Sequence, residues 1–160
     1  MSSAGNKLAG MPDCSIVHKH WDELSTTELY AFLKLRTDVF FVEQKVDEEE
    51  LDNRDQVAEH FFIADAIGTA AYLRVLFDES PEHLDAHRVV GRVVVRADRR
   101  GEGLASRLLD RVLSLYGHEA MLLHAQEYVA PLYAKAGFVP FGLPYDEAGI
   151  QHISMYRSAN

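Results

Sequence analysis

The chain has 160 residues, 48% of them hydrophobic, and a formal net charge of −9. This length and composition predict one folded domain with a sizeable core and exclude a disordered chain. The excess of acids argues against a general nucleic-acid-binding protein, because phosphate contacts need clustered Lys and Arg. No apolar stretch approaches the roughly 18 residues of a membrane helix, so we expect no membrane partner. The single cysteine, Cys14, favours a reducing, cytoplasmic location.

The first part of the chain predicts a tail, a strand and a helix. Residues 1–12 are small, polar and aperiodic, and they predict a disordered N-terminal tail ahead of one domain over 13–160. A strand is expected over 16–20. The segment Ser25-Thr26-Thr27-Glu28 has the pattern of a capping box, and it predicts a helix over 26–38.

From residue 47 onward, the sequence predicts strands that alternate with helices. A short helix or loop is expected over 47–57, followed by strands over 60–65 and 69–77 that form a hairpin about Gly68, a loop over 78–87 and a strand over 88–96. The next expected element is a helix whose apolar face carries Leu104, Leu108, Leu109, Val112 and Leu115. A strand over 121–125, a short helix over 129–136 stopped by Gly137, and strands over 138–142 and 150–156 joined by a turn at 146–149 complete the chain. This order predicts an α/β fold with a mixed sheet and helices packed on its faces. The valines of 88–96 predict a central strand buried on both sides.

Charged residues gather in two segments of opposite sign. The basic segment holds seven of the 16 Lys and Arg, namely Arg88, Arg92, Arg96, Arg99, Arg100, Arg107 and Arg111. The acidic segment holds eight acids, namely Glu43, Asp47, Glu48, Glu49, Glu50, Asp52, Asp55 and Glu59. The first segment suits a small polyanion and the second suits a cation, although solvated faces would show the same pattern.

Between Val93 and Ser106, a strand runs into an Arg/Gly-rich turn that opens a helix. Helix N-termini leave amides unpaired and glycines allow close approach, so such a turn can hold a pyrophosphate. A P-loop is excluded because its Gly-Lys-Ser/Thr ending is absent. A dinucleotide site is disfavoured, because Ser106 stands at the third Gly position and the strand over 121–125 offers no acid. The segment Arg100-Gly101-Glu102-Gly103-Leu104-Ala105 has instead the pattern Arg-x-x-Gly-x-Ala.

This pattern resembles the coenzyme A pyrophosphate motif of the GNAT acetyltransferase superfamily. About 30 residues later, the segment 132–138 resembles the family's second signature, in which a short helix ends in a Gly-Phe step and Tyr133 stands at the family's tyrosine. The segment 35–44 resembles the "LR…VF.VEQ" stretch of the ElaA-like branch, and further matches extend the resemblance over residues 24–156. Ala97 departs from the Pro that is frequent after the strand.

The resemblance implies the GNAT fold, a central, mostly antiparallel sheet of about seven strands with helices on both faces. It also implies acetyl-CoA as the cosubstrate, with no metal. The cofactor-binding residues that it implies are Val93, Val94 and Val95 through their main chain, Gly101, Gly103, Leu104, Ala105 and Ser106 through their amides, and Arg99 or Arg100 through charge-assisted bonds.

The resemblance further assigns catalytic roles to a few side chains. Tyr133 would act as general acid toward the departing thiolate, with a plain packed aromatic as the alternative. The general base stays open among Glu43, His60 and His152, each of which could instead be structural; Glu43, for example, could pair with Arg36. Imidazole suits proton transfer near neutral pH, whereas a carboxylate would act through a bridging water. The sequence shows no His or Cys cluster with zinc spacing.

Three functions are open on the sequence alone. The first is an N-acetyltransferase acting on a primary amine of a small molecule or peptide, and the acids over 43–59 favour a cationic acceptor. The second is a non-catalytic acyl-CoA-binding sensor or scaffold of the same fold, and the third is a nucleotide-binding protein. The apolar and aromatic residues of the hairpin over 138–156 also suggest a homodimer, with a monomer as the alternative.

Overall fold

The computed structural model describes residues 15–160. The tail predicted at residues 1–12 and the single cysteine lie outside the described residues. Within them, none of the helices combines the length and the apolar character that a membrane span requires.

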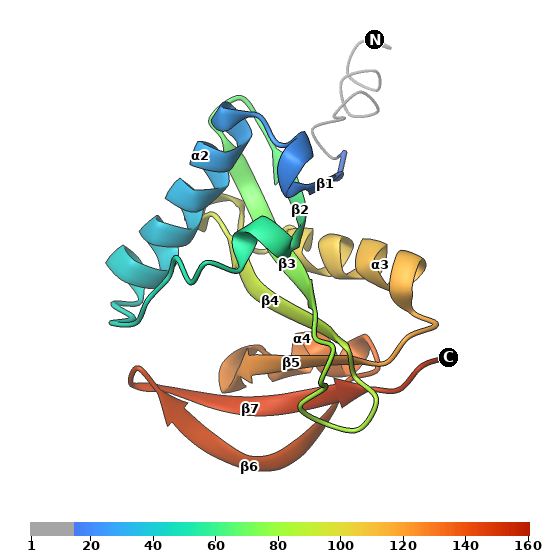
Figure 1. Cartoon of the computed structure of the whole chain (residues 1–160). Helices are drawn as coiled ribbons and strands as arrows, with labels where there is room; N and C mark the ends of the chain where they lie inside the picture. Colours follow the sequence, from blue (N-terminus) through green and yellow to red (C-terminus); the bar gives the residue numbers. More distant parts are fainter. Residues whose placement is uncertain (1–14) are drawn as a thin grey trace, which may run out of the picture.

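A seven-stranded sheet forms the centre of the molecule (Figure 1). The strands are β1 (Val17–His20), β2 (Glu59–Ala64), β3 (Thr69–Phe77), β4 (Arg88–Val95), β5 (Met121–Gln126), β6 (Val139–Glu147) and β7 (Ile150–Arg157). Their spatial order is β1-β2-β3-β4-β5-β7-β6, and every neighbouring pair is antiparallel except β4 and β5. The predicted mixed, mostly antiparallel sheet is therefore confirmed.

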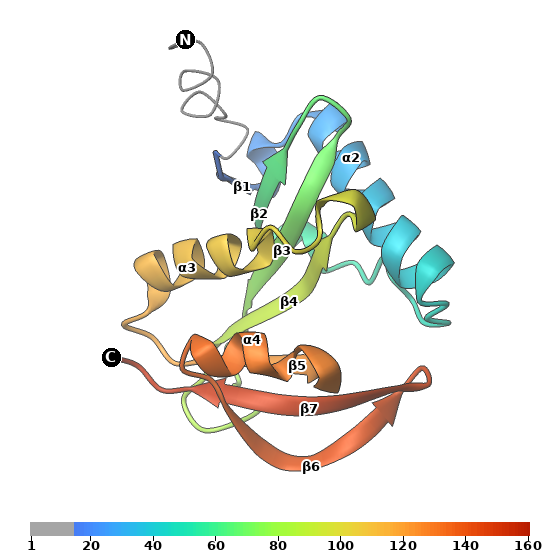
Figure 2. The same ribbon diagram turned by 180° about the vertical axis from the view of Figure 1, so that it is seen from behind.

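The helices lie on both sides of this sheet (Figure 2). They are α2 (Thr26–Arg36), the π-helix η3 (Thr37–Glu43), α3 (Leu104–Tyr116), α4 (Ala130–Lys135) and the short 3-10 turns η2 (Trp21–Glu23), η4 (Asp55–Val57), η5 (Ala97–Arg99) and η6 (Glu127–Val129). The predicted capping box is present, because the Ser25 hydroxyl accepts from the Glu28 amide at 3.0 Å and the Glu28 carboxylate accepts from the Ser25 amide at 2.9 Å. The helical path continues beyond its predicted end, since η3 carries it to Glu43.

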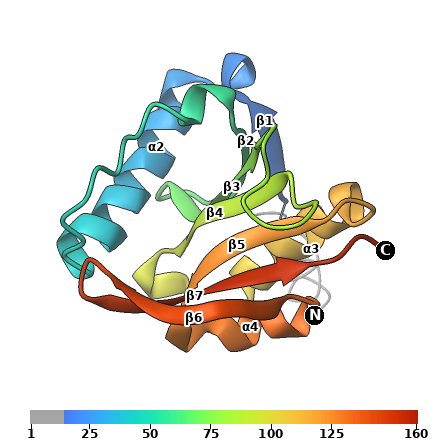
Figure 3. The ribbon, with the colours of Figure 1, turned by 60° about the horizontal axis from the view of Figure 1, so that its bottom comes forward.

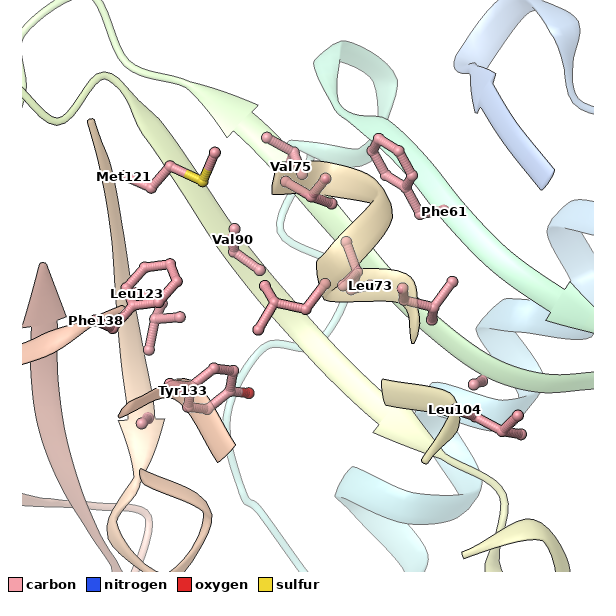
Figure 4. Close-up of a cluster of buried hydrophobic side chains, with 14 of the residues drawn as sticks. Phe61, Leu73, Val75, Val90, Leu104, Met121, Leu123, Tyr133 and Phe138 are labelled. Atoms are coloured by element: carbon pink, nitrogen blue, oxygen red, sulfur yellow. The ribbon is translucent and has the colours of Figure 1, made fainter. Parts of the chain in front are cut away.

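Two apolar cores lie on opposite faces of the sheet. The larger core packs α3, α4 and the C-terminal strands against β2 and β3, and it includes Phe61 and Leu108 (Figure 4). The smaller core packs α2 and η3 on the other face, with Phe32, Phe62 and Tyr72 at its centre. Because side chains alternate along a strand, the neighbours Phe61 and Phe62 serve different cores.

The most deeply buried strand is β3 rather than β4. Eight of the nine residues of β3 are buried, whereas most of β4 is only half-buried. The prediction that the valine-rich strand is covered on both sides is therefore wrong, because part of β4 borders a cleft. Leu115 also departs from prediction: its 40% exposure places it at the margin of the apolar face of α3.

The strands β4 and β5 run parallel for only two residue pairs and then separate. The pairs are Arg88 with Met121 and Val89 with Leu122. Beyond them, β4 also carries an irregularity in its pairing with β3, where Arg92 has a φ of 53°. The sheet is thereby split into two arms, one of β1 to β4 and one of β5, β7 and β6. Figure 3 shows the end of η3, which packs on the first arm, lying beside the turn between β6 and β7 of the second arm.

Candidate active site

A cleft of about 880 Å³ opens between the two arms. One wall consists of β4, the turn before α3 and the end of η3. The other wall consists of β5, β6, β7 and α4. The cleft therefore brings together several predicted site residues that are far apart in the sequence, namely Val93, Val94, Val95, Arg100, Ala105, Tyr133, Glu43 and His152.

The β4 wall offers main-chain groups. Beyond Val89, β4 has no ladder to β5, so the chain over Val93–Val95 faces the cleft without a strand partner on that side. The side chain of Val94 is buried in the smaller core, while Val93 and Val95 are half-buried against the larger one. These valines thus combine a packing role for their side chains with a main-chain edge that has no strand partner, although the Val95 carbonyl accepts from Arg100.

The turn before α3 is built from backbone that requires glycine. Gly101 and Gly103 have φ values of 83° and 76°, in the left-handed region, and a Cβ added at either would meet open space. Gly103 is the N-cap of α3 and has no side chain to cap it. The first helical bond runs from the Arg107 amide to the Gly103 carbonyl at 3.1 Å, so the preceding amides are left for a ligand or for solvent. Such a turn fits the diphosphate of an acyl-CoA.

The other motif residues differ in position. Ala105 borders the cleft, Ser106 is half-buried beside it, and Leu104 is buried in the larger core. Arg99 does not border the cleft, because its guanidinium binds Asp65 at 2.7 Å and Glu102 at 2.9 Å. Of the two arginines proposed for the phosphates, Arg100 is the one that borders the cleft.

Arg100 connects the cofactor turn to η3. Its guanidinium makes two bonds to the Glu43 carboxylate, of 2.7 and 2.9 Å, and its Nε donates to the Val95 carbonyl at 3.1 Å. The hydrogen bond from Arg100 lowers the pKa of Glu43. Glu43 thus pairs with Arg100 rather than with Arg36, and it stands at the mouth of the cleft as an ionised carboxylate.

Tyr133 lies at the bottom of the cleft, where the two arms diverge. Figure 4 shows its ring between β5 and β4, with the hydroxyl directed away from β5. The side chain is buried and packs edge-on against Phe138 at 6.2 Å between ring centroids. Burial raises the pKa of Tyr133 well above its ordinary value, so the phenol is protonated at neutral pH.

The two candidate histidines have different positions. His60 is fully buried and does not border the cleft: its ring nitrogens bind the Tyr72 hydroxyl at 2.7 Å and the Asp55 carbonyl at 2.9 Å, and burial lowers its pKa. The structure therefore contradicts a place for His60 in the acceptor pocket. His152 does border the cleft, with Nδ1 bonded to the Ile150 carbonyl at 2.7 Å.

The acidic segment serves in part to neutralise the protein's own arginines. Arg36 is fully buried and bonds Glu50 at 2.6 Å and Asp55 at 2.8 Å. Arg74 bonds Asp55 at 2.9 Å, and Arg92 at the irregularity of β4 bonds Glu50 at 2.9 Å. These acids are therefore not available to attract a substrate, contrary to a reading of the whole segment as a cation site. Other acids do border the cleft, namely Glu48, Glu49, Glu82 and Glu147.

Sequence reasoning missed several polar residues of the cleft. Gln44 bonds Gln126 across the gap at 2.9 Å, which ties the end of η3 to β5. On the β5 wall, His124 lies between Ser154 and Glu82. In the sequence, His124 interrupts the apolar residues of the strand predicted over 121–125, and this polar position could have indicated a site residue. Nothing in the sequence around Glu82 distinguishes it from an ordinary loop residue.

Comparison with known proteins defines the class. Residues 31–159 match the family model described as an acetyltransferase (GNAT) domain, so the chain belongs to the GNAT family. Within it, the chain is 35% identical to protein ElaA of Escherichia coli, covering 86% of this chain and 92% of that one, and 37% identical to a UPF0039 protein of Mycobacterium tuberculosis, covering 84% and 87%.

Solved structures agree with this placement. The crystal structure of E. coli ElaA is similar with a TM-score of 0.79 and 32% identity, over 90% of this chain and 99% of that one. An acyl-CoA N-acyltransferase from Pseudomonas aeruginosa is similar with a TM-score of 0.78 and 36% identity, over the same shares. The chain is thus an ElaA-like member of the GNAT family.

Proposed function

We propose that this chain is an N-acetyltransferase that moves an acetyl group from acetyl-CoA to a primary amine of a cationic small molecule or peptide. The observation that carries the proposal is the separation of β4 from β5 beside an uncapped helix start. It leaves main-chain groups along Val93–Val95 and amides at Gly101–Ser106 facing the place where an acyl-CoA arm and its diphosphate would lie. Membership of the GNAT family supports an acyl-CoA donor.

The chemistry requires proton transfer at two points. An alkyl ammonium has a pKa of about 10, so it must lose a proton before its nitrogen can attack a thioester. A main-chain amide of β4 would stabilise the oxyanion that forms. Tyr133, which its burial keeps protonated, would donate to the departing thiolate. Of the bases predicted from the sequence, Glu43 and His152 border the cleft and stay candidates.

A cationic acceptor is supported by the charge of the cleft lining. Beside the acids that pair with arginines, the lining holds four carboxylates without an arginine partner among the described residues, namely Glu48, Glu49, Glu82 and Glu147. The negative electrostatic potential of these carboxylates concentrates cations in the cleft. We therefore expect amines with a second positive charge to be better substrates than neutral-tailed amines of equal length.

Thiol release tests the proposal. The purified protein is mixed with acetyl-CoA and matched pairs of diamines and monoamines, while calorimetry measures acetyl-CoA binding alone. Binding together with faster thiol release for diamines is the expected result. Binding without thiol release for any amine would support the sensor instead, and absence of binding would overturn both functions.

Two further expectations from the sequence are kept as proposals. We place the protein in the cytoplasm, and we propose a homodimer through the hairpin of β6 and β7, which exposes Val139 and Leu143. Sedimentation at micromolar concentration would reveal the dimer, and a Leu143→Glu variant that sediments more slowly would assign it to this hairpin.

A further inference from the structure

Three polar side chains lie in a line on the β5 wall of the cleft. The Oγ of Ser154 on β7 is 2.9 Å from Nδ1 of His124 on β5, and Nε2 of His124 is 3.1 Å from a carboxylate oxygen of Glu82 in the loop before β4. All three border the cleft. His124 and Ser154 are directly opposite in the β5–β7 ladder, so the sheet register itself holds the hydroxyl against the ring.

When the His124 imidazole is neutral, the hydrogen-bond inventory sets the direction of this line. A carboxylate only accepts, so the Nε2–H of His124 donates to Glu82. Nδ1 is then the acceptor and the Ser154 hydroxyl donates to it. Tyr145 also hydrogen-bonds Ser154 and takes one lone pair of its oxygen, so the second lone pair is left to accept a hydrogen bond from a group in the cleft. A carboxylate that orients a histidine, which in turn receives a proton from a hydroxyl, is the arrangement of a general-base relay.

We propose that Ser154, His124 and Glu82 form the proton relay that deprotonates the acceptor amine. Ser154 is the catalytic residue that touches the ammonium. One N–H proton passes to the Ser154 oxygen as the Ser154 hydroxyl proton passes to Nδ1 of His124. The products are a neutral amine and an imidazolium, and Glu82 is a positioning residue that holds the ring and stabilises its charge. This inference rests on the proposed acetyltransferase function.

The surroundings of His124 are compatible with this role. The Tyr145 ring packs edge-on against it at 6.3 Å, and Tyr145 also interacts with Ser154. Among residues 15–160, Glu82 is the charged side chain that contacts the His124 ring. By contrast, His152 has Nδ1 occupied by a carbonyl, and it stacks on Tyr145 at 5.6 Å and lies 3.6 Å from Glu147. His152 therefore has a packed ring without a hydroxyl partner.

The test compares two amines whose need for a base differs. One is an alkyl ammonium, and the other is an amine that is already neutral at the assay pH. The variant His124→Asn keeps a side-chain partner for Ser154 but cannot carry a proton. We expect kcat/KM for the alkyl ammonium to fall by about 100-fold or more and its rise with pH to flatten. The neutral amine should change by less than about 5-fold, because it has no proton to lose before attack.

Matched variants separate a relay from a structural effect. Ser154→Ala should reproduce the result, and the double variant should be no worse than the more severe single one, because the residues act as a unit. Glu82→Gln should lower kcat/KM by about 10-fold. His118→Asn, at an exposed position outside the cleft, is the control.

The outcomes are distinguishable from failure of the proposed function itself. Acetyl-CoA binding by calorimetry should be unchanged in all of these variants, and wild-type protein without binding or thiol release would contradict the acetyltransferase function. Equal loss with both amines would overturn the relay in favour of a packing role. A pH rise that persists in His124→Asn and disappears in His152→Asn would assign the base to His152 and also overturn it.

Discussion

The two walls of the cleft are built from different parts of the polypeptide. The wall that would hold the cofactor presents main chain: the unpaired edge of β4 and the glycine turn before α3. The opposite wall presents side chains from β5, β6 and β7, such as His124, His152 and Ser154. Main-chain groups are the same for every residue, so the first wall can persist through sequence change as long as the turn keeps its glycines. The second wall can alter its acceptor by a few substitutions, and this explains why fold and donor are easier to infer than substrate.

The largest expected effect comes from the buried ion-pair network behind the first wall, which joins α2, η4 and β3. Asp55 accepts from both Arg36 and Arg74, and all three side chains are buried. Replacing Asp55 with Ala leaves two buried guanidinium groups without this partner, so we expect the free energy of unfolding to fall by about 3–5 kcal/mol. Urea denaturation measures it. Asp98→Ala, which removes an exposed ion pair with Arg96, is the control and should leave the urea midpoint nearly unchanged.

The pH dependence of this effect has a defined sign. Burial acts to raise the pKa of Asp55, but the hydrogen bonds and charges of Arg36 and Arg74 outweigh it and lower the pKa. The stabilisation is therefore complete above the unfolded-state pKa of about 3.9 and is lost as pH falls through the lower folded-state value. The difference between wild type and Asp55→Ala should be constant from pH 5 to 8 and shrink below about pH 4. A difference that grows in acid would contradict this assignment.

The cofactor wall is tested by Gly103→Glu. A side chain in the left-handed region costs about 1–2 kcal/mol, and a carboxylate would also repel the diphosphate. We expect acetyl-CoA affinity to fall by about 100-fold or more, measured by calorimetry. Gly103→Gln carries the same strain without the charge and should lose only about 10-fold. Unchanged affinity in both would show that the turn is only a helix start.

Tyr133→Phe tests the general-acid role of the tyrosine that lies where the two walls of the cleft meet. Removal of the hydroxyl should lower kcat by about 100-fold while acetyl-CoA binding stays within about 2-fold, since a general acid acts after binding. Stopped-flow thiol release and calorimetry measure the two quantities. Tyr30→Phe, at an exposed position on α2, is the control. A fully active Tyr133→Phe protein would show that Tyr133 only packs as an aromatic residue and is not the general acid.

The smallest effect is expected at the exposed ion pair within the first wall, between Glu43 at the end of η3 and Arg100 in the turn before α3. Glu43→Gln frees the guanidinium of Arg100, so affinity for coenzyme A should rise by about 2–5-fold at low salt, and the gain should decline as salt screens the pair. Asp38→Asn removes the exposed partner of Lys34, away from the cleft and the glycine turn, and should change nothing. Weaker binding in Glu43→Gln would instead mean that the pair positions Arg100 for the phosphates.

The difference between the walls also decides what could be predicted. The glycine turn and the order of strands follow from local patterns, and the structure and family match confirm the fold. The partner of Glu43 could not be predicted, because Arg100 is 57 residues away. His60 was misplaced because a strand pattern does not say which face meets the cleft. The β4 valines appeared to form a buried strand because separation from β5 depends on where the ladder stops, which no local pattern encodes.

The outer strand of the sheet has a consequence for behaviour at high concentration. β6 lies at the edge, its pairing with β7 is irregular between Phe141 and Tyr145, and it contains Pro140 and Pro144. Prolines lack an N–H, and an irregular edge does not present a straight row of donors and acceptors. Another chain therefore cannot extend the sheet there by continuous strand pairing. A dimer at this hairpin would have to use side-chain faces, and the same interruption protects the protein from edge-to-edge aggregation.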